Sequence, residues 1–327
     1  VPLVAVYNSQ GDVFSLDENA VLQKWQFDQK GEQVQLEKSA PTATLAGGAF
    51  SKDGRLLVVW EARSSIARVF DVQKAMFLAE LNGHSDALTS VAFSQDPRLV
   101  GTAEESNPLL LQIVTASMDG TVRIWKRAYV PGWYMAEVLP GHQKGATYVS
   151  TSAVAKEIVT ADGTGVIRFW QDGVQSGAGL GRLKQVILGH TGRVDSVVFS
   201  ADGTEVASAS RDGTARRWSK TQELVTEVKA DPVCDPKAPP YRCPFFKSSA
   251  MNAAATLLVT ANDAAVDNVQ LWDIAKARAG RADAMIRKFG DVGSVNELAM
   301  SVDGRWLAVL PSAGNTWIWD VADVQNP

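Results

Sequence analysis

The stretch "GHTGRVDSVVFSADGTEVASASRDGTARRW", residues 189–218, decides the fold of the chain. Turns rich in Ser, Asp and Gly divide it into short segments, "DSVVFS", "EVASAS" and "TARRW", in which apolar and polar residues alternate. Alternation at period two indicates β-strands rather than helices. The stretch also brings His190, Ser208 and Asp212 within about thirty residues, and those three residue types together can form the catalytic centre of a hydrolase.

The same arrangement recurs along the whole chain. Alternating apolar segments end in an aromatic residue, and these ends are spaced 45 to 55 residues apart. The ends are Trp25, Phe70, Trp125, Trp170, Trp218, Trp272 and Trp319. A repeat of this length is typical of propellers, in which each repeat forms one sheet and neighbouring sheets cover each other's faces. We therefore expect an all-β fold in which residues 1–327 form one domain, a seven-bladed β-propeller of four-stranded antiparallel blades.

The last repeat is short. Only eight residues, "DVADVQNP", follow Trp319, which leaves no fourth strand for that blade. We expect either a three-stranded last blade or completion by residues outside this sequence. An open strand edge of this kind can accept a strand from a partner. Because the chain also begins within a strand-like segment, "VPLVAVYN", we expect it to be part of a longer protein.

Three recurring motifs resemble those of the WD40-repeat family. Gly-His pairs occur at Gly83-His84, Gly141-His142 and Gly189-His190. Trp-Asp pairs close two repeats, at Trp272-Asp273 and Trp319-Asp320. The turn "DGT" occurs at residues 119–121 and 212–214. The chain is similar to WD40-repeat proteins over essentially its whole length, and the resemblance implies a propeller that forms part of a larger signalling or scaffold protein.

The resemblance also answers the question of catalysis. It implies that in each well-formed blade a histidine, a strand hydroxyl, a turn aspartate and an indole N–H are joined by hydrogen bonds. Two sets of residues fit this pattern: His84, Thr115, Asp119 and Trp125, and His190, Ser208, Asp212 and Trp218. Buried polar groups need such partners. All three histidines of the chain occupy Gly-His positions, so none remains for catalysis, and we expect no catalytic residues.

Other blades depart from this pattern. Blade four has His142 and Thr160, but Asp162 comes two residues before the expected position, which Thr164 occupies. Blade two has Pro41 and Trp60 in place of the histidine and the hydroxyl, and blade seven has Asp291 and Val309. Blade six carries two extra residues before Trp272. We expect these blades to depend more on apolar packing.

Binding residues of propellers concentrate on the loops. By the strand order, residues at the starts of inner strands and just before tight turns line the narrower face. These candidates for a partner-binding face are Arg193, Asp195, Arg211, Asn296, Arg63, Met118 and Glu18. Tyr241 joins them because aromatic residues anchor interfaces, whereas Phe245 and Phe246 either contribute in the same way or begin the next inner strand and are buried. The alternative for each candidate is that it lies on a solvated rim and binds no partner.

The two cysteines, Cys234 and Cys243, lie in a proline-containing loop. They form either a local disulfide or two reduced thiols. A disulfide favours an extracytoplasmic location, whereas the cytoplasm is favoured otherwise. Zinc needs four ligands as a rule, and no histidine or further cysteine lies close by in the sequence, so we expect no metal.

Composition excludes several other roles. The net charge of −4 and the pI near 5.5 disfavour a nucleic-acid surface, and no apolar run is long enough for membrane insertion. The glycine-rich residues 173–182 precede an extended segment rather than a helix, so we do not expect a phosphate site. The segment 275–289 has helical composition and is expected to be a short excursion between third and fourth strands.

We therefore expect a non-catalytic protein- or peptide-interaction or sensor module without a cofactor. The alternatives are a small-molecule-binding propeller that uses its channel and, less favoured, an enzyme on a propeller scaffold. The sequence indicates neither the identity of the partner nor an oligomeric state.

Overall fold

The computed structural model describes residues 2–7, 13–17, 21–26, 29–35, 45–51, 53–74, 76–95, 111–127, 133–152, 154–171, 182–219, 224–229, 245–252, 254–262, 268–290, 292–301, 304–311 and 317–321. Expectations for Glu18, Pro41, Cys234, Tyr241, Cys243 and Asp291 fall outside these residues. Backbone contacts group the chain into two units, of which unit 1 is Val1–Gly163 with Arg168–Val186 and unit 2 is Thr164–Ile167 with Ile187–Pro327.

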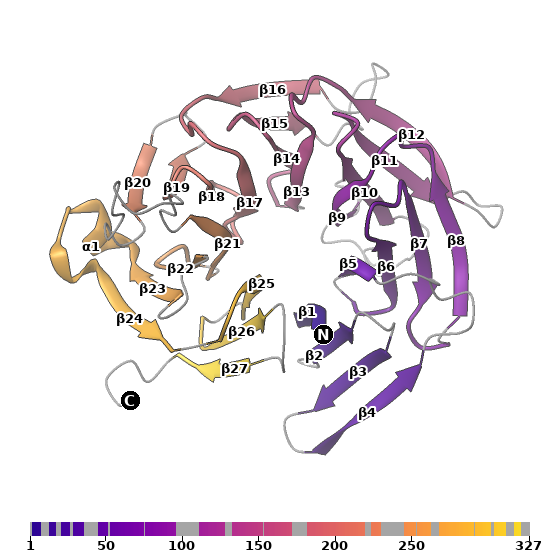
Figure 1. The fold of residues 1–327 in the computed structure, drawn as a ribbon, viewed down its shortest axis with the longest axis horizontal. Helices are drawn as coiled ribbons and strands as arrows, with labels where there is room; N and C mark the ends of the chain where they lie inside the picture. The colour runs from indigo at the N-terminus through magenta and orange to yellow at the C-terminus, as the bar shows by residue number, and fades with distance from the viewer. Residues whose placement is uncertain are drawn as a thin grey trace, which may run out of the picture. The chain divides into compact units, whose positions relative to one another are not determined.

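The sheets are antiparallel, and strands that follow one another in the chain are hydrogen-bonded neighbours (Figure 1). Apart from the turn at 164–167, unit 1 holds the first four sheets. The first sheet consists of β1 (Pro2–Tyr7), β2 (Val13–Asp17), β3 (Val21–Gln26) and β4 (Gln29–Gln35). The second consists of β5 (Leu45–Phe50), β6 (Leu56–Glu61), β7 (Ile66–Asp71) and β8 (Met76–Asn82). The third consists of β9 (Leu88–Gln95), β10 (Leu111–Ser117), β11 (Val122–Arg127) and β12 (Trp133–Leu139). The fourth consists of β13 (Ala146–Ser152), β14 (Glu157–Asp162), β15 (Ile167–Gln171) and β16 (Arg182–Ile187).

Unit 2 begins with the stretch that decides the fold. Its first sheet consists of β17 (Val194–Phe199), β18 (Glu205–Ser210), β19 (Thr214–Ser219) and β20 (Leu224–Lys229), so the strands expected there are confirmed. The next sheet consists of β21 (Phe246–Met251), β22 (Leu257–Asn262), β23 (Val269–Asp273) and β24 (Met285–Phe289). The last sheet consists of β25 (Val295–Met300), β26 (Trp306–Pro311) and β27 (Trp317–Asp320).

The number of complete blades differs from the expectation. The described residues form six four-stranded blades and a last sheet of three strands, so the prediction of seven four-stranded blades is wrong. The reason lies at β27, which pairs with β26 along one edge while no strand of the described residues pairs with its other edge. A three-stranded last sheet is one of the two outcomes that the short final repeat predicts.

Burial follows the order of strands within a sheet. Every residue of β10 and of β14, both second strands, is buried, whereas the fourth strand β8 is largely half-buried or exposed. A strand covered on both faces carries a nearly continuous apolar run, as "IVTA" in β10 does. Hydroxyl side chains in such a strand need partners within the protein, because water does not reach them.

Neighbouring sheets within each unit pack through apolar cores. In unit 1, Ile124 and Val122 of β11 and Val149 of β13 belong to one buried cluster. In unit 2, Leu271 of β23 and Leu298 of β25 belong to another. Hydroxyls on the inner strands add hydrogen bonds between sheets. The Val149 amide donates to Ser90 Oγ, and the Leu298 amide donates to Ser248 Oγ.

An excursion between third and fourth strands is present, but it ends at Ala284, because residues 285–289 of the expected segment form the fourth strand β24. Helix α1 (Ile274–Arg278) and the short 3-10 helix η2 (Ala282–Ala284) separate β23 from β24. Asp273 caps α1, because its carboxylate accepts a hydrogen bond from the Lys276 amide. In the described part of the chain, no helix has the length and hydrophobicity needed to cross a membrane.

Candidate functional site

The first predicted hydrogen-bond network is present in the β9–β12 sheet. His84 Nδ1 lies 2.8 Å from Asp119 Oδ2, and His84 Nε2 lies 2.8 Å from Thr115 Oγ1. The indole N–H of Trp125 donates to the same hydroxyl over 2.9 Å. Asp119 also accepts hydrogen bonds from the hydroxyl and the amide of Thr121. The network therefore ties the loop before β9 to β10, β11 and the turn between them.

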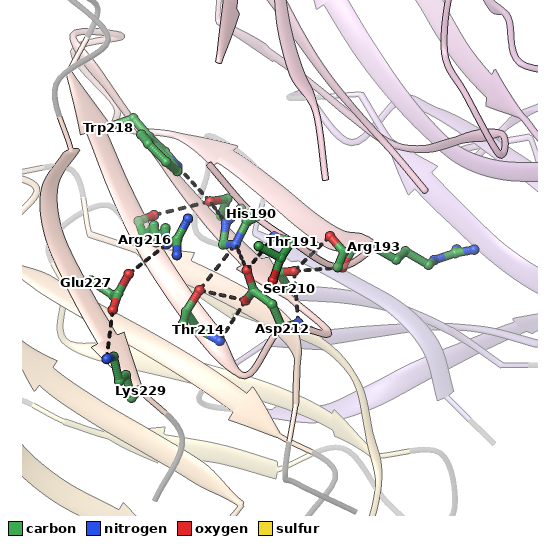
Figure 2. A network of polar contacts seen from close by, with 12 residues as sticks. His190, Thr191, Arg193, Ser210, Asp212, Thr214, Arg216, Trp218, Glu227 and Lys229 are labelled. Carbon is green, nitrogen blue, oxygen red and sulfur yellow. Dashed lines mark hydrogen bonds and ion pairs between the residues drawn. The ribbon is translucent and has the colours of Figure 1, made fainter. Parts of the chain in front are cut away.

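The β17–β20 sheet repeats this network with a serine (Figure 2). His190 Nδ1 lies 2.8 Å from Asp212 Oδ2, and His190 Nε2 lies 2.8 Å from Ser208 Oγ. The Trp218 indole donates to Ser208 Oγ over 2.8 Å, and the Thr214 hydroxyl donates to Asp212 Oδ1 over 2.6 Å. Two blades thus use the same geometry at equivalent positions.

The arrangement assigns a proton to each group. A carboxylate only accepts, so the histidine Nδ1 that faces it carries hydrogen, and Nε2 of a neutral ring is then an acceptor. The strand hydroxyl donates to Nε2 and accepts from the indole. Ser208 is 0% exposed and Thr115 is 1% exposed, with each hydroxyl oxygen held between histidine and tryptophan. No substrate reaches either hydroxyl, so the triad-like set is a buried network rather than a nucleophilic site.

Burial and hydrogen bonding set the pKa values of these groups. Burial lowers the pKa of His84, and this effect outweighs the opposing effect of Asp119. Burial alone raises the pKa of Asp119, but hydrogen bonds from Thr121 and His84 outweigh it and bring the pKa to about 2. The pKa of Asp212 also lies below its ordinary value, because hydrogen bonds, the largest from His190, outweigh the effect of burial. At neutral pH His84 is therefore neutral and both aspartates are ionised.

The β13–β16 sheet shows how a blade without the turn aspartate is held. His142 Nε2 lies 2.7 Å from Thr160 Oγ1, and the Trp170 indole donates to that hydroxyl over 2.8 Å. The buried Asp162 carboxylate instead accepts a hydrogen bond from Arg168 over 2.6 Å. Among the described residues, His142 Nδ1 has no hydrogen-bond partner. Burial, with the nearby Arg168 charge, lowers the pKa of His142 to about 4.

The other divergent blades use different contacts. The Trp60 indole packs over Gly47, where a Cβ would lie only 2.4 Å from the ring, and Trp60 belongs to the apolar core between the second and third sheets. In the sheet with two extra residues, the Trp272 indole still donates to Thr260 Oγ1, over 2.9 Å. In the last sheet Trp319 stacks on Phe289, with ring centroids 4.6 Å apart.

Three of the candidate binding residues form one cluster in unit 2. Asp195 lies on β17, and its two carboxylate oxygens each accept a hydrogen bond from one arginine. Arg193 Nε lies 2.6 Å from Oδ1, and Arg211 Nε lies 2.7 Å from Oδ2. The Asp195 side chain is 11% exposed, whereas those of Arg193 and Arg211 are 32% and 50% exposed. The cluster therefore has a partly buried acidic centre and two more accessible cations.

The backbone that carries these arginines is fixed to the neighbouring network. The Arg211 amide donates to the Arg193 carbonyl over 2.8 Å, and Ser210 Oγ donates to the Gly192 and Arg193 carbonyls. A Cβ on Gly192 would lie 2.8 Å from the Asp212 amide nitrogen, so the two loops approach too closely for a larger residue. Figure 2 shows the Arg193 side chain extending away from this network.

The remaining candidates are distributed over both units. In unit 1, Arg63 lies exposed in the turn between β6 and β7 with φ of 63°, and Met118 lies in the turn between β10 and β11. In unit 2, Asn296 is exposed on β25, next to Val295. Neither Arg63, Met118 nor Asn296 has a described contact with the Arg193–Asp195–Arg211 cluster.

The structure adds Thr121, Thr214 and Lys247, which were not among the candidates, and places Phe245 and Phe246, for which two roles were open. Thr121 and Thr214 bind the turn aspartates, and their place in the "DGT" turns is a signal that could have identified them. Phe246 is buried at the start of β21, whereas Phe245 lies under Arg211, whose guanidinium carbon is 5.1 Å from the ring centroid. Lys247 occupies the position on β21 that Asp195 occupies on β17, and no local pattern marks it.

Among the described residues, no three His, Cys, Asp or Glu side chains are placed to hold a metal ion. The chemistry that the Arg193–Asp195–Arg211 cluster offers is therefore that of hydrogen-bond donors and positive charge.

Comparison with known proteins identifies the repeats. Residues 76–126 and 181–219 match the WD40 family model, described as "WD domain, G-beta repeat". These two segments contain the two complete networks. The chain is 25% identical over 260 residues to pre-mRNA-processing factor 19 of Oryza sativa subsp. japonica, a match that covers 79% of this chain and 42% of that protein. The chain thus spans less than half the length of this relative.

Two solved structures share the fold over nearly the whole chain. The structure of U3-55K has a TM-score of 0.73 at 19% identity, and the match covers 98% of this chain and 92% of that one. The crystal structure of RRP9 WD40 repeats has a TM-score of 0.72 at 20% identity, with coverage of 98% and 90%. Residues 76–126 and 181–219 therefore contain WD40 repeats, and the chain shares the fold of these two solved structures.

Proposed function

We propose that residues 1–327 form one WD40 propeller domain that binds a protein or peptide on the loops around β17 and β19. The observation that carries this proposal is the contrast between two sets of polar residues. Those that resemble a catalytic triad are buried and fully bonded to one another, whereas Arg193 and Arg211 are accessible and stand on fixed backbone. Rigid loops with accessible charged groups suit recognition of a partner surface.

The relatives support an interaction role over an enzymatic one. The rice relative is named for pre-mRNA processing, and a relative from Botryotinia fuckeliana, 24% identical over 164 residues, is named for ribosome biogenesis. We propose by analogy that this propeller is likewise a scaffold within a larger assembly and is not an enzyme. The net charge of −4 supports a protein partner over a nucleic acid.

The experiment is affinity capture with a matched variant. The protein and an Arg193→Ala/Arg211→Ala double variant are immobilised side by side and exposed to lysate from the source cells, and retained proteins are identified by mass spectrometry. We expect a specific set that the wild type retains and the double variant loses. Identical sets on both proteins would contradict the proposed face. If the wild type retains no protein and a metabolite raises its melting temperature, the small-molecule alternative is favoured.

A further inference from the structure

We infer that the Arg193–Asp195–Arg211 cluster is a docking point for the carboxylate side chains of an acidic protein segment. The inference rests on the proposed interaction function and names the chemistry of the partner. It follows from the way in which the two guanidinium groups are held, from the charge around them and from their accessibility.

Asp195 uses only a small part of the donor capacity of the arginines. A guanidinium group has five N–H donors in a planar fork, and in both arginines it is Nε that contacts Asp195. The paired Nη groups of Arg193 and Arg211 make no hydrogen bond among the described residues. Asp195 therefore orients both forks through Nε and leaves the edge formed by the two Nη groups of each arginine for bidentate binding of a carboxylate.

Other contacts fix the orientation of the forks before a ligand arrives. The Arg211 guanidinium lies over the Phe245 ring, with 5.1 Å between its central carbon and the ring centroid. The backbone hydrogen bond between Arg211 and Arg193 sets the spacing of the two residues. Because long side chains lose conformational freedom when they bind, a cluster that is already held loses less on binding a partner.

The charge of the cluster selects an acidic ligand. Two guanidinium groups against one carboxylate leave a positive balance, on a chain whose net charge is −4. Lys247, at the equivalent position on the adjacent inner strand β21, adds a further cation, and its ammonium donates to Ser294 Oγ over 2.7 Å. A local cationic group on an acidic protein attracts carboxylates and repels basic segments.

The direct test uses a fluorescein-labelled peptide of alternating glutamate and glycine, with the matching glutamine–glycine peptide as a control. Fluorescence anisotropy measures binding to the purified protein at low and at physiological salt. We expect the wild type to bind the glutamate peptide in preference to the glutamine peptide, and more weakly at the higher salt concentration. Equal affinity for both peptides would overturn the inference.

Variants then test the role of the forks. We expect Arg193→Gln and Arg211→Gln each to weaken binding about tenfold, through loss of charge-assisted hydrogen bonds. Arg211→Lys keeps the charge but not the fork, so it should weaken binding by a similar factor. Unchanged affinity in Arg211→Lys would refute bidentate recognition. The control is Arg281→Gln, because Arg281 is exposed and pairs with Asp283 in the excursion between β23 and β24.

The control variant must leave binding unchanged, and an equal loss there would overturn the assignment to this cluster. Each single arginine variant should keep a melting temperature close to that of the wild type, because Asp195 retains its hydrogen bond from the other arginine. The Arg281 variant should do so because an exposed ion pair contributes little to stability. The outcome also separates this inference from the proposed function. If the wild type captures a partner through Arg193 and Arg211 but shows no preference for the glutamate peptide, the inference of an acidic ligand is refuted while the proposed interaction function stands.

Discussion

Replacement of Asp212 with alanine is the most direct test of the buried network. Asp212 Oδ2 accepts hydrogen bonds from His190 Nδ1–H and the Thr191 amide, and Oδ1 accepts from the Thr214 amide and hydroxyl. Alanine removes both acceptor oxygens and with them all four hydrogen bonds. The hydrogen bond from the Thr191 amide is exposed, so that amide gains water instead. The loss of stability therefore comes chiefly from the buried donors of His190 and Thr214.

The magnitude follows from three donors, the His190 Nδ1–H, the Thr214 amide and the Thr214 hydroxyl. A buried donor left without an acceptor costs about 1–3 kcal/mol. Because these donors belong to one network, their contributions do not simply add. We expect the free energy of unfolding to fall by about 2–4 kcal/mol. The pKa of Asp212 lies below its ordinary value, so the carboxylate is ionised at neutral pH and the full effect is present there.

Asp202→Ala is the matched control. Asp202 accepts a hydrogen bond from Ser200 Oγ over 2.6 Å and others from the Thr204 amide and hydroxyl, so its turn resembles that of Asp212 but lacks a buried histidine. We expect a loss below about 1 kcal/mol for this variant. Urea unfolding followed by tryptophan fluorescence gives both values, and hydrogen exchange of the 189–193 loop localises the effect. Equal losses in the two variants would refute the network as the source of stability.

Three further predictions concern the same blades. Thr115→Val leaves the Trp125 indole N–H without an acceptor and should cost about 2–3 kcal/mol in the same urea assay, whereas a change within error would contradict that role. The pKa of His142 is about 4, because burial, together with Arg168, disfavours its charged form. The ordinary pKa of histidine is 6.5, so below pH 6.5 His142 binds a proton in the unfolded chain but not in the folded one. The free energy of unfolding should therefore fall as the pH is lowered from 6.5 to about 4. His142→Gln should flatten this decline between pH 7 and 5. Gly120→Ala meets the His142 carbonyl oxygen at 2.8 Å and a φ of +80°, so it should lower the melting temperature more than Gly280→Ala, where φ is +66° and space is open.

The strands were predictable because the information for them is local. The alternation in "EVASAS" and "TARRW" and the turn residues between them lie within a few positions of one another, and β18 and β19 begin where that pattern begins. The short final repeat left two outcomes for the last sheet, three strands or completion by residues outside this sequence, and the described residues form three strands.

The candidate site was predictable in part. Arg193, Asp195 and Arg211 could be placed on neighbouring loops from the strand order. Their pairing could not be predicted. The Asp195 oxygen that each Nε contacts depends on the side-chain geometry between β17 and the turn after β18. Phe245 directly precedes β21 of the next sheet, and its position under Arg211 depends on how the two sheets pack.

The sequence alone determined the repeat and the strand positions, and its resemblance to the WD40-repeat family implied the membership of the two complete networks. Periodicity and turn chemistry act over short distances along the chain, and a motif that recurs in register fixes equivalent positions. Only the tertiary structure decided that Ser208 and Thr115 are inaccessible, that Arg168 takes over at Asp162, and that two arginines share Asp195. Burial and charge pairing depend on groups from separate strands and loops, and the distances between those groups are set when the strands pair and the sheets pack.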